Sequence, residues 1–321
     1  MNDNVTVLFD ADVDRLADLG ELIGVMKQVF RHQRDDRLVS PPRSVVKLPA
    51  GDLVFTIGGT PDHGGFRVYN TFGRVKHTQQ FLAPAHPDAR PEMRQVVVVF
   101  DMKTNQMQGV IIGDHLSAYR SGSISGAAMD LMAPRETAIL TVLGTGHHAK
   151  TQLLAALAVR KFREIRVFSR TPERRASFVA DMSARIGQPI RNCDSAEQAV
   201  RGADVLVSAT TSGTPVYDAQ WVAPNAYVCS VGPKSKAASE MPAGIAARAA
   251  HIATDAPVQF EAFRGSHALA GTADFDRVRP VSEWLDGSPP GEGIRLFLME
   301  GLAGTEVITG ACLISAAKRE G

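Results

Sequence analysis

Residues 144–149 carry the glycine spacing of a turn that can hold a phosphate. The chain reads Gly144-Thr145-Gly146-His147-His148-Ala149, with an apolar run before it and a helical pattern after it. The first glycine permits a tight turn, the second lets the backbone approach a pyrophosphate, and the alanine leaves room for helix and strand to pack. The N–H groups and positive dipole end of the following helix favour phosphates. The pattern therefore predicts a dinucleotide site formed by these six residues.

A second candidate cluster follows the next apolar run, residues 164–168, and consists of Ser169, Arg170, Thr171 and Arg174. A site for NAD(H) usually places an acidic residue at this strand end, where it binds the ribose 2′-hydroxyl. A hydroxyl beside guanidinium groups instead suits a 2′-phosphate, through charge-assisted hydrogen bonds. We therefore expect NADP(H) in preference to NAD(H). The alternative is that both arginines are solvated residues at a helix start.

Small residues, several with hydroxyl groups, follow two further strand-like runs, 204–209 and 227–231. In doubly wound folds a ligand lies beyond the carboxyl ends of the strands. We therefore expect these ends to line the ribose and nicotinamide side of the cofactor. The residues concerned are Ala209, Thr210, Thr211, Ser212, Val231 and Gly232.

The elements that position these residues alternate between strand and helix. Strand patterns cover residues 138–143, 164–168, 204–209, 227–231 and 250–254, and helical patterns cover 147–160 and 172–186. Alternation at this spacing builds a parallel sheet with right-handed crossovers. The fold class expected is α/β, with a Rossmann doubly wound parallel sheet.

The first 120 residues follow another pattern. One helix is predicted over 14–31, and then strands over 44–48, 52–58, 65–69, 95–100 and 107–112, with a loop over 81–94. Strands in succession favour an antiparallel or mixed sheet, and so an α+β domain. A small-residue helix is expected over 117–131, and a helical tail from about 303 is expected to pack back onto this domain. The predicted domains are residues 1–120 with 303–321, and a dinucleotide-binding domain over 121–302.

Composition excludes several classes of protein. The 321 residues carry a net charge of +1, so no basic bias indicates nucleic acid or an acidic membrane as a partner. No apolar run approaches the roughly 20 residues that span a bilayer. The three cysteines are Cys193, Cys229 and Cys312, and they lack the spacing of metal ligands. We therefore expect no metal, and we expect the three thiols to be buried and inert. Because the N-terminus lacks a secretory pattern, we expect a cytoplasmic protein.

With these residues in place, the chain resembles the ornithine cyclodeaminase/mu-crystallin family over nearly its whole length. The markers are Leu116-Ser-Ala-Tyr-Arg120-Ser-Gly, the turn Leu143-Gly-Thr-Gly-His-His-Ala, the run Ala203-Asp-Val-Leu-Val-Ser-Ala-Thr-Thr-Ser, Val231-Gly and Gly301-Leu-Ala. The resemblance implies a homodimer with an N-terminal dimerisation and substrate domain. It also implies hydride transfer at a carbon that bears nitrogen and adjoins a carboxylate.

Two arginines match residues that bind the substrate carboxylate in that family. Arg120 is the firmer match and Arg43, in Pro-Pro-Arg-Ser, is the weaker one. The planar fork of a guanidinium can bind a carboxylate through two hydrogen bonds at once. The alternative for Arg120 is an ion pair with a structural carboxylate.

Two departures from the family pattern concern catalysis. Arg67 stands where the family has a catalytic lysine, and Lys234 stands where the cyclodeaminases have an aspartate. Arginine keeps the positive charge but does not readily release a proton. Arg43, Arg67, Arg120 and Lys234 could border one cleft, which would favour a substrate with more than one acidic group. Lys234 and His77 are the candidates for a proton donor, although either could be an ordinary surface residue.

The leading interpretation is an NADP(H)-dependent reductase of an imino acid or ketimine, or an enzyme of the reverse reaction, amino-acid dehydrogenation. A lyase-type cyclodeaminase with bound NAD is a second possibility, and it must explain Arg67 and Lys234. A non-catalytic NADPH-binding protein of the mu-crystallin type is a third. In each case the partner is a small anionic amino or imino acid, whose identity the sequence does not show.

Overall fold

The computed structural model describes residues 5–49, 51–70, 95–287 and 290–320. The chain divides into two compact units. The first, called here unit 1, combines Met1–Ser123 with Gly301–Gly321, and unit 2 is the segment Ile124–Glu300. Each unit has its own sheet.

Unit 1 is built on a mixed six-stranded sheet in the order β1-β6-β5-β4-β3-β2. Strand β1 runs parallel to β6, and every other neighbouring pair is antiparallel, as the run of successive strand patterns predicts. The sequence analysis missed β1, and the other five strands lie where it expected them. The bounds are β1 (Thr6–Phe9), β2 (Ser44–Leu48), β3 (Gly51–Gly59), β4 (His63–Asn70), β5 (Gln95–Asp101) and β6 (Gln106–Ile112).

The single helix expected over 14–31 is two helices, α1 (Asp10–Leu16) and α2 (Leu19–Arg34). The expectation was wrong because it took no account of capping. The side chain of Asp18 accepts a hydrogen bond from the backbone N–H of Glu21 at 2.9 Å, so a new helix begins there. The predicted loop at 81–94 lies outside the described residues.

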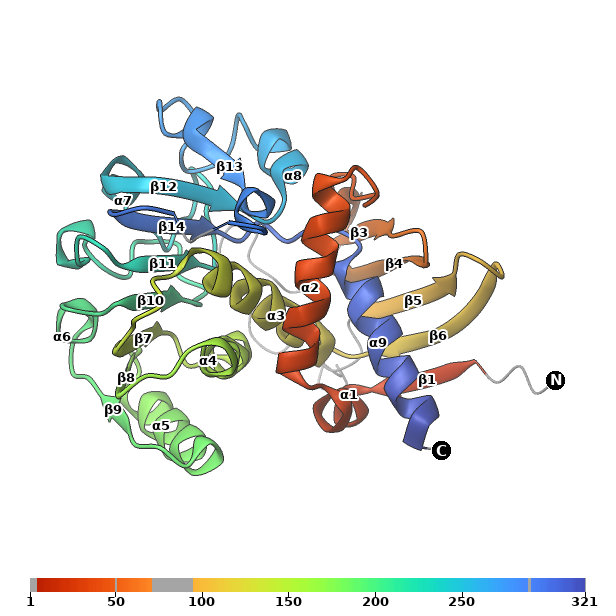
Figure 1. The fold of residues 1–321 in the computed structure, drawn as a ribbon, viewed down its shortest axis with the longest axis horizontal. Coiled ribbons are helices and arrows are strands. Elements are labelled where there is room, and N and C mark those ends of the chain that lie inside the picture. The colour runs from red at the N-terminus through yellow and green to blue at the C-terminus, as the bar shows by residue number, and fades with distance from the viewer. Residues whose placement is uncertain (1–4, 50, 71–94, 288–289, 321) are drawn as a thin grey trace. The chain divides into compact units, whose positions relative to one another are not determined.

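The C-terminal helix α9 (Thr305–Glu320) packs on strands β3 to β6 and on helices α1 and α2, as expected of the tail (Figure 1). Its small residues let it approach the sheet closely: a Cβ at Gly310 would lie 2.8 Å from Ile111 Cδ1. Val307, Ala311 and Ile314 of the helix join Val99 and Ile111 of the sheet in one buried cluster. The last helix of the chain therefore completes the core of unit 1.

Unit 2 holds an eight-stranded sheet in the order β13-β12-β14-β11-β10-β7-β8-β9, and all of its pairs are parallel. The α/β fold class is thus confirmed. The sequence analysis missed β9, β13 and β14, of which β14 lies between β11 and β12. The bounds are β7 (Ile139–Leu143), β8 (Glu164–Phe168), β9 (Ile190–Asn192), β10 (Val205–Ser208), β11 (Tyr227–Ser230), β12 (Ala249–Thr254), β13 (Val278–Pro280) and β14 (Ile294–Leu298).

Helices cover both faces of this sheet. Figure 1 shows α4 and α5 on one side and α6 and α7 on the other, which is the result of right-handed crossovers that run first one way from β7 and then the other. The direction reverses at β7, which lies between β8 and β10, so a ligand is expected beyond the carboxyl ends of β7 and β10. The helices are α3 (His115–Met132), which starts in unit 1, α4 (His147–Val159), α5 (Pro172–Ile186), α6 (Ala196–Val200), α7 (Gly244–Arg248) and α8 (Pro257–Ala262).

The three cysteines are free thiols. Cys193 and Cys229 are buried and Cys312 is half-buried. Burial raises the pKa of all three thiols. The pKa of Cys229 is raised to about 12 and that of Cys312 to about 11. In the described ranges, no helix is long and apolar enough to cross a membrane, and no group of three metal-ligating side chains is assembled.

Candidate functional site

The two glycines of the turn after β7 have different structural roles. Gly144 has φ +117°, and a Cβ there would lie 2.4 Å from the carbonyl oxygen of Ala209, which follows β10. Gly146 is the N-cap of α4, has ordinary extended backbone angles, and a Cβ there would meet nothing within 4 Å. Gly144 is therefore needed for the fold, whereas Gly146 leaves open space at the helix start.

The other residues of the turn fit the same arrangement. Thr145 is half-buried, His147 and His148 are exposed in the first turn of α4, and Ala149 is fully buried against the strand. Open space at an exposed helix start is what a pyrophosphate requires. All six predicted residues thus follow the carboxyl end of β7, the strand at which the strand order reverses.

This difference between the two glycines makes a testable prediction. We expect Gly144→Ala to lower the melting temperature and weaken cofactor binding together, since it places a side chain against backbone at a positive φ. We expect Gly146→Ala to keep the melting temperature within about 2 °C of wild type and to weaken NADPH binding about tenfold or more. Thermal unfolding and fluorescence titration with NADPH measure the two effects. Unchanged NADPH affinity in Gly146→Ala would show that this turn does not hold the phosphates.

Three arginines follow β8, of which two are exposed and one is buried. Arg170 and Arg174 are exposed and form no ion pair within the described part of the chain. Arg175, which the sequence analysis did not single out, is buried: it donates to the carbonyl oxygen of Ser169 at 2.8 Å and also to Asn192. Arg175 therefore fixes the loop from within and leaves the other two guanidinium groups on its surface. Thr171 is exposed and is the N-cap of α5.

The carboxyl ends of β10 and β11 are joined by a buried carboxylate that the sequence analysis missed. Glu240 is fully buried. One carboxylate oxygen accepts hydrogen bonds from the hydroxyls of Ser208 (2.8 Å) and Ser230 (3.2 Å) and from the backbone N–H of Gly232 (2.7 Å). The other accepts from the backbone N–H and the hydroxyl of Thr210, at 2.8 and 2.7 Å.

These bonds change what the predicted cofactor residues can offer. The N–H groups of Thr210 and Gly232 are already engaged by Glu240, and Ser212 donates its hydroxyl to the carbonyl oxygen of Thr214 at 2.7 Å. Thr211 is exposed, and Val231 is half-buried beyond β11. The two turns therefore owe their shape to contacts within the protein.

Lys234 is buried in the loop after β11. Its ammonium donates to the carbonyl oxygens of Ser230 at 3.3 Å and Gly232 at 2.7 Å. It belongs to unit 2, whereas the three candidate arginines belong to unit 1. His77, the other candidate proton donor, lies outside the described residues.

In unit 1 two of the candidate arginines meet on one carboxylate, Glu306 of α9. Arg120, on α3, donates to Glu306 Oε1, and Arg67, on β4, donates to the same oxygen at 2.9 Å. Arg67 also donates to Gln95 Oε1 at 2.6 Å and lies over the ring of Tyr69. Arg120 is 7% exposed and the Glu306 side chain 3%, so water does little to screen these charges.

The pKa values reflect this burial. Burial by itself raises the pKa of Glu306, but the charges of Arg120 and Arg67 outweigh it, so the pKa lies below its ordinary value. Burial lowers the pKa of Arg67, and the positive charges of Arg120 and Arg43 lower it further. The negative charge of Glu306 raises this pKa, but not by enough to offset burial. Arginine stays protonated at neutral pH even so.

Arg43 lies close to the same cluster. A Cβ at Gly301 would lie 3.6 Å from Arg120 Nη1 and 3.7 Å from Arg43 Nη2, so the two guanidinium groups lie next to the same glycine. Arg67 and Arg120 share the single carboxylate of Glu306, so these two guanidinium groups carry more positive charge than Glu306 neutralises. The buried Nε of Arg120 has no hydrogen-bond partner among the described residues. The cluster is therefore suited to bind an anion.

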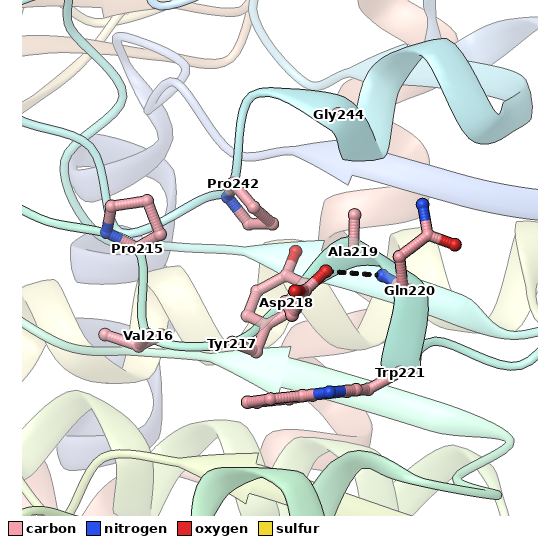
Figure 2. A pocket seen from close by; sticks show the side chains of 9 residues that line it. All are labelled: Pro215, Val216, Tyr217, Asp218, Ala219, Gln220, Trp221, Pro242 and Gly244. Atoms are coloured by element: carbon pink, nitrogen blue, oxygen red, sulfur yellow. Dashed lines mark hydrogen bonds between the residues drawn. The ribbon is translucent and has the colours of Figure 1, made fainter.

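A pocket of about 550 Å³ in unit 2 is separate from these residues. Figure 2 shows it lined by residues 215–221, with the rings of Tyr217 and Trp221, and by Pro242 and Gly244. Its acidic residue, Asp218, caps the short helix η2 (Ala219–Trp221) through the N–H of Gln220 at 2.8 Å. None of the predicted cofactor or substrate residues lines it.

The sequence pattern that defines the ornithine cyclodeaminase/mu-crystallin family matches residues 4–312. The chain belongs to this family. The resemblance inferred from the motifs is therefore confirmed over nearly the whole chain.

Two relatives and one solved structure illustrate what the chain is similar to. The chain is 29% identical over 227 residues to the ketimine reductase mu-crystallin of Mus musculus, covering 64% of this chain and 69% of that protein. It is 27% identical over 233 residues to the iminosuccinate reductase of Paracoccus denitrificans, covering 71% and 72%. The structure of the Δ1-pyrroline-2-carboxylate reductase of Thermococcus litoralis with NADH and L-proline superposes with a TM-score of 0.84, at 21% identity and 98% coverage of both chains. All three of these proteins are named as reductases, and their names describe C=N substrates.

Proposed function

We propose that this chain is an NAD(P)H-dependent reductase of an imino acid or ketimine. In the reverse direction the same reaction is the dehydrogenation of an amino acid. The observation that carries the proposal is the buried guanidinium cluster around Glu306, with its excess positive charge, in a chain whose other unit has a dinucleotide turn. A cation that holds a carboxylate and a cofactor that accepts or donates hydride are the two requirements of this reaction.

The residues of the chain divide this work. Arg120 holds the carboxylate next to the reacting carbon, because its Nε and Nη1 are not used by Glu306. Gly144 and Gly146 let the backbone at the start of α4 approach the pyrophosphate. When bound, the nicotinamide supplies or accepts the hydride. In the reductive direction hydride adds to the carbon of a protonated imine and the π electron pair of the C=N bond moves to nitrogen, which gives the neutral amine.

The charge of the cluster also narrows the substrate class. Arg43 lies next to Arg120 beside Gly301, so a second carboxylate or other acidic group of the substrate would meet a further guanidinium group there. Arg67 cannot serve as a proton donor in place of the family lysine, but its charge favours such a group. The expected substrate is therefore a small imino acid with more than one acidic group.

Cofactor preference is the finer part of the proposal. Arg170 and Arg174, exposed and unpaired within the described residues, support NADP(H) over NAD(H). We expect Arg170→Ala and Arg174→Ala each to raise the KM for NADPH about tenfold, and to leave the KM for NADH within about twofold, since only NADPH carries the 2′-phosphate. Exposed Arg163→Ala, in the same unit, is the control. A wild-type protein that prefers NADH would contradict the preference.

Optical measurement of NADPH oxidation tests the function. The substrates are a panel of 2-oxo acids with ammonia or methylamine, and preformed cyclic imines, each series including members with one and with two carboxylates. The proposal expects turnover, fastest for two carboxylates. Ammonia release from ornithine without a net change in nicotinamide absorbance would instead establish a cyclodeaminase.

A non-catalytic NADPH-binding protein is the second candidate. The observation in its favour is that Arg67, at the position of the family lysine, is held by Gln95 and Glu306. Tight NADPH binding with no turnover over the whole panel would establish it.

We also propose a cytoplasmic homodimer that associates through unit 1. Among the large apolar side chains exposed in the described residues, all but Val258 belong to unit 1, and every residue of β2 is exposed. Exposed apolar side chains that gather in one unit favour an interface there. Light scattering of the full chain is expected to give twice the chain mass of 34.4 kDa. A monomer at micromolar concentration would refute the dimer.

A further inference from the structure

The turn Ser230–Gly232, after β11, is held from two sides by opposite charges. Glu240 accepts from its donors, the hydroxyl of Ser230 and the N–H of Gly232. Lys234 donates to its acceptors, the carbonyl oxygens of the same two residues. Every one of these atoms except the hydroxyl belongs to the backbone, so the two charges together fix the path of the chain.

Glu240 extends the same hold to the neighbouring strand. Its second oxygen binds the N–H and hydroxyl of Thr210, and its first oxygen also binds Ser208 at the end of β10. The space is full: a Cβ at Gly232 would lie 2.3 Å from the carbonyl oxygen of Thr210 and 2.5 Å from Glu240 Oε2. Glycine at 232 is thus required by the carboxylate that joins the two turns.

The two charges compensate each other without touching. Glu240 is fully buried and Lys234 is 8% exposed, and within the described residues they form no direct ion pair with each other. A buried charge without compensation is costly. The backbone dipoles of Ser230 and Gly232, oriented with N–H or hydroxyl toward the anion and C=O toward the cation, connect them. Removing either charge therefore leaves the other uncompensated and releases the turn.

We propose that Glu240 and Lys234 are a pair of positioning residues that fix the β10 and β11 turns for the nicotinamide end of the cofactor. Lys234 acts through its charge and its two hydrogen bonds, and not as a proton donor. The proposal rests on the proposed function for the identity of the cofactor. It replaces the expectation that Lys234 supplies the proton of the reaction. An imine that arrives protonated needs no such donor, because hydride addition to C=N–H⁺ gives the neutral amine directly.

The experiment combines a double-mutant cycle with a conservative variant. Glu240→Gln, Lys234→Met and the double variant are each titrated with NADPH by fluorescence, and their melting temperatures are recorded. Lys234→Arg is assayed for NADPH binding and for turnover of the best imine of the panel. Glu197→Gln, which removes an exposed carboxylate that pairs with Arg201 on α6, is the control. Ser208→Ala, which removes one of the five hydrogen bonds, gives a milder change should Glu240→Gln fail to fold.

The expected result has three parts. Each single variant raises the Kd for NADPH about tenfold or more, and the double variant raises it by much less than the product of the two, because both charges hold the same turn. Ser208→Ala gives a smaller increase. Lys234→Arg retains NADPH affinity and turnover within about fivefold, since a guanidinium can donate to both carbonyl oxygens but does not readily release a proton.

Two results would overturn the inference. Loss of turnover in both Lys234→Met and Lys234→Arg, with wild-type NADPH affinity, would make Lys234 the proton donor. Wild-type affinity in Glu240→Gln and in Ser208→Ala would show that the turns do not depend on the carboxylate. If wild type itself binds neither NADPH nor NADH, the proposed function fails, and this outcome is distinct from both.

Discussion

Replacing Arg120 by alanine is expected to lower kcat/KM for the imino-acid substrate by about 100-fold or more, with NADPH affinity unchanged. Loss of a buried, charge-assisted contact to a carboxylate costs about 2–5 kcal/mol, and each 1.4 kcal/mol is about tenfold in rate. NADPH binding is expected to be spared because Arg120 is not among the residues proposed to hold the cofactor. Steady-state kinetics and an NADPH titration measure the two effects.

Arg120→Lys is the informative control. It keeps the positive charge beside Glu306 but loses the planar fork, so it is expected to recover part of the stability and little of the specificity constant. Melting temperatures of both variants separate misfolding from lost chemistry. A fully active Arg120→Ala variant with a lowered melting temperature would mean that Arg120 only pairs with Glu306, which is the structural alternative considered from the sequence.

The second large effect is expected from Glu306→Gln, which should lower the free energy of unfolding by about 3 kcal/mol or more. Breaking a buried ion pair from one side leaves the remaining charges uncompensated, and here two guanidinium groups share the carboxylate. Glu320→Gln is the matched control on the same helix: its partner Arg15 is exposed and solvent screens the pair, so little or no loss of stability is expected. Chemical denaturation of the full chain gives both values.

The acid dependence of stability follows from the same carboxylate. The pKa of Glu306 in the folded chain lies below its ordinary value of 4.5, so its contribution is complete above that pH and is lost as the pH falls through the lowered pKa. Glu306→Gln should lack this part of the acid dependence. Denaturation series at neutral pH and below pH 4.5 compare the two proteins.

Small dianions should distinguish an anion site from a merely structural ion pair. Glu306→Gln removes the carboxylate that Arg67 and Arg120 share, so succinate is expected to raise the melting temperature of Glu306→Gln more than that of wild type. Succinate that stabilises both proteins equally, or neither, would contradict the view that this cluster binds acidic groups.

Elements with strong local patterns could be predicted from the sequence, and those defined by their neighbours could not. Strands β2 to β6 and helix α5 stood out by periodicity and punctuation. Strand β14 (Ile-Arg-Leu-Phe-Leu) was missed because Arg295 interrupts its apolar pattern and because it pairs between β11 and β12, far from its place in the sequence. The break between α1 and α2 depends on one capping side chain, which periodicity does not report.

The residues of the candidate site divide in the same way: those within local motifs could be predicted, and those that only the fold brings together could not. Glycine spacing located the turn after β7, and the motif around Arg120 located that arginine. Glu306 was missed because its partner Arg67 lies 239 residues away in the chain, and only the fold brings α9 beside β4. Glu240 follows a loop without a recognisable motif, so its five hydrogen bonds to the β10 and β11 turns were not foreseeable.

The raised pKa values of the cysteines have a practical consequence. Only the thiolate reacts with maleimides and related reagents, and Cys229 and Cys312, with pKa values of about 12 and 11, are almost entirely protonated at neutral pH. Cys193 is fully buried as well. The native protein should therefore behave toward such reagents as if it had no cysteine. One cysteine introduced at an exposed position in each unit would then accept a dye selectively, so that energy transfer can follow the two units through a catalytic cycle.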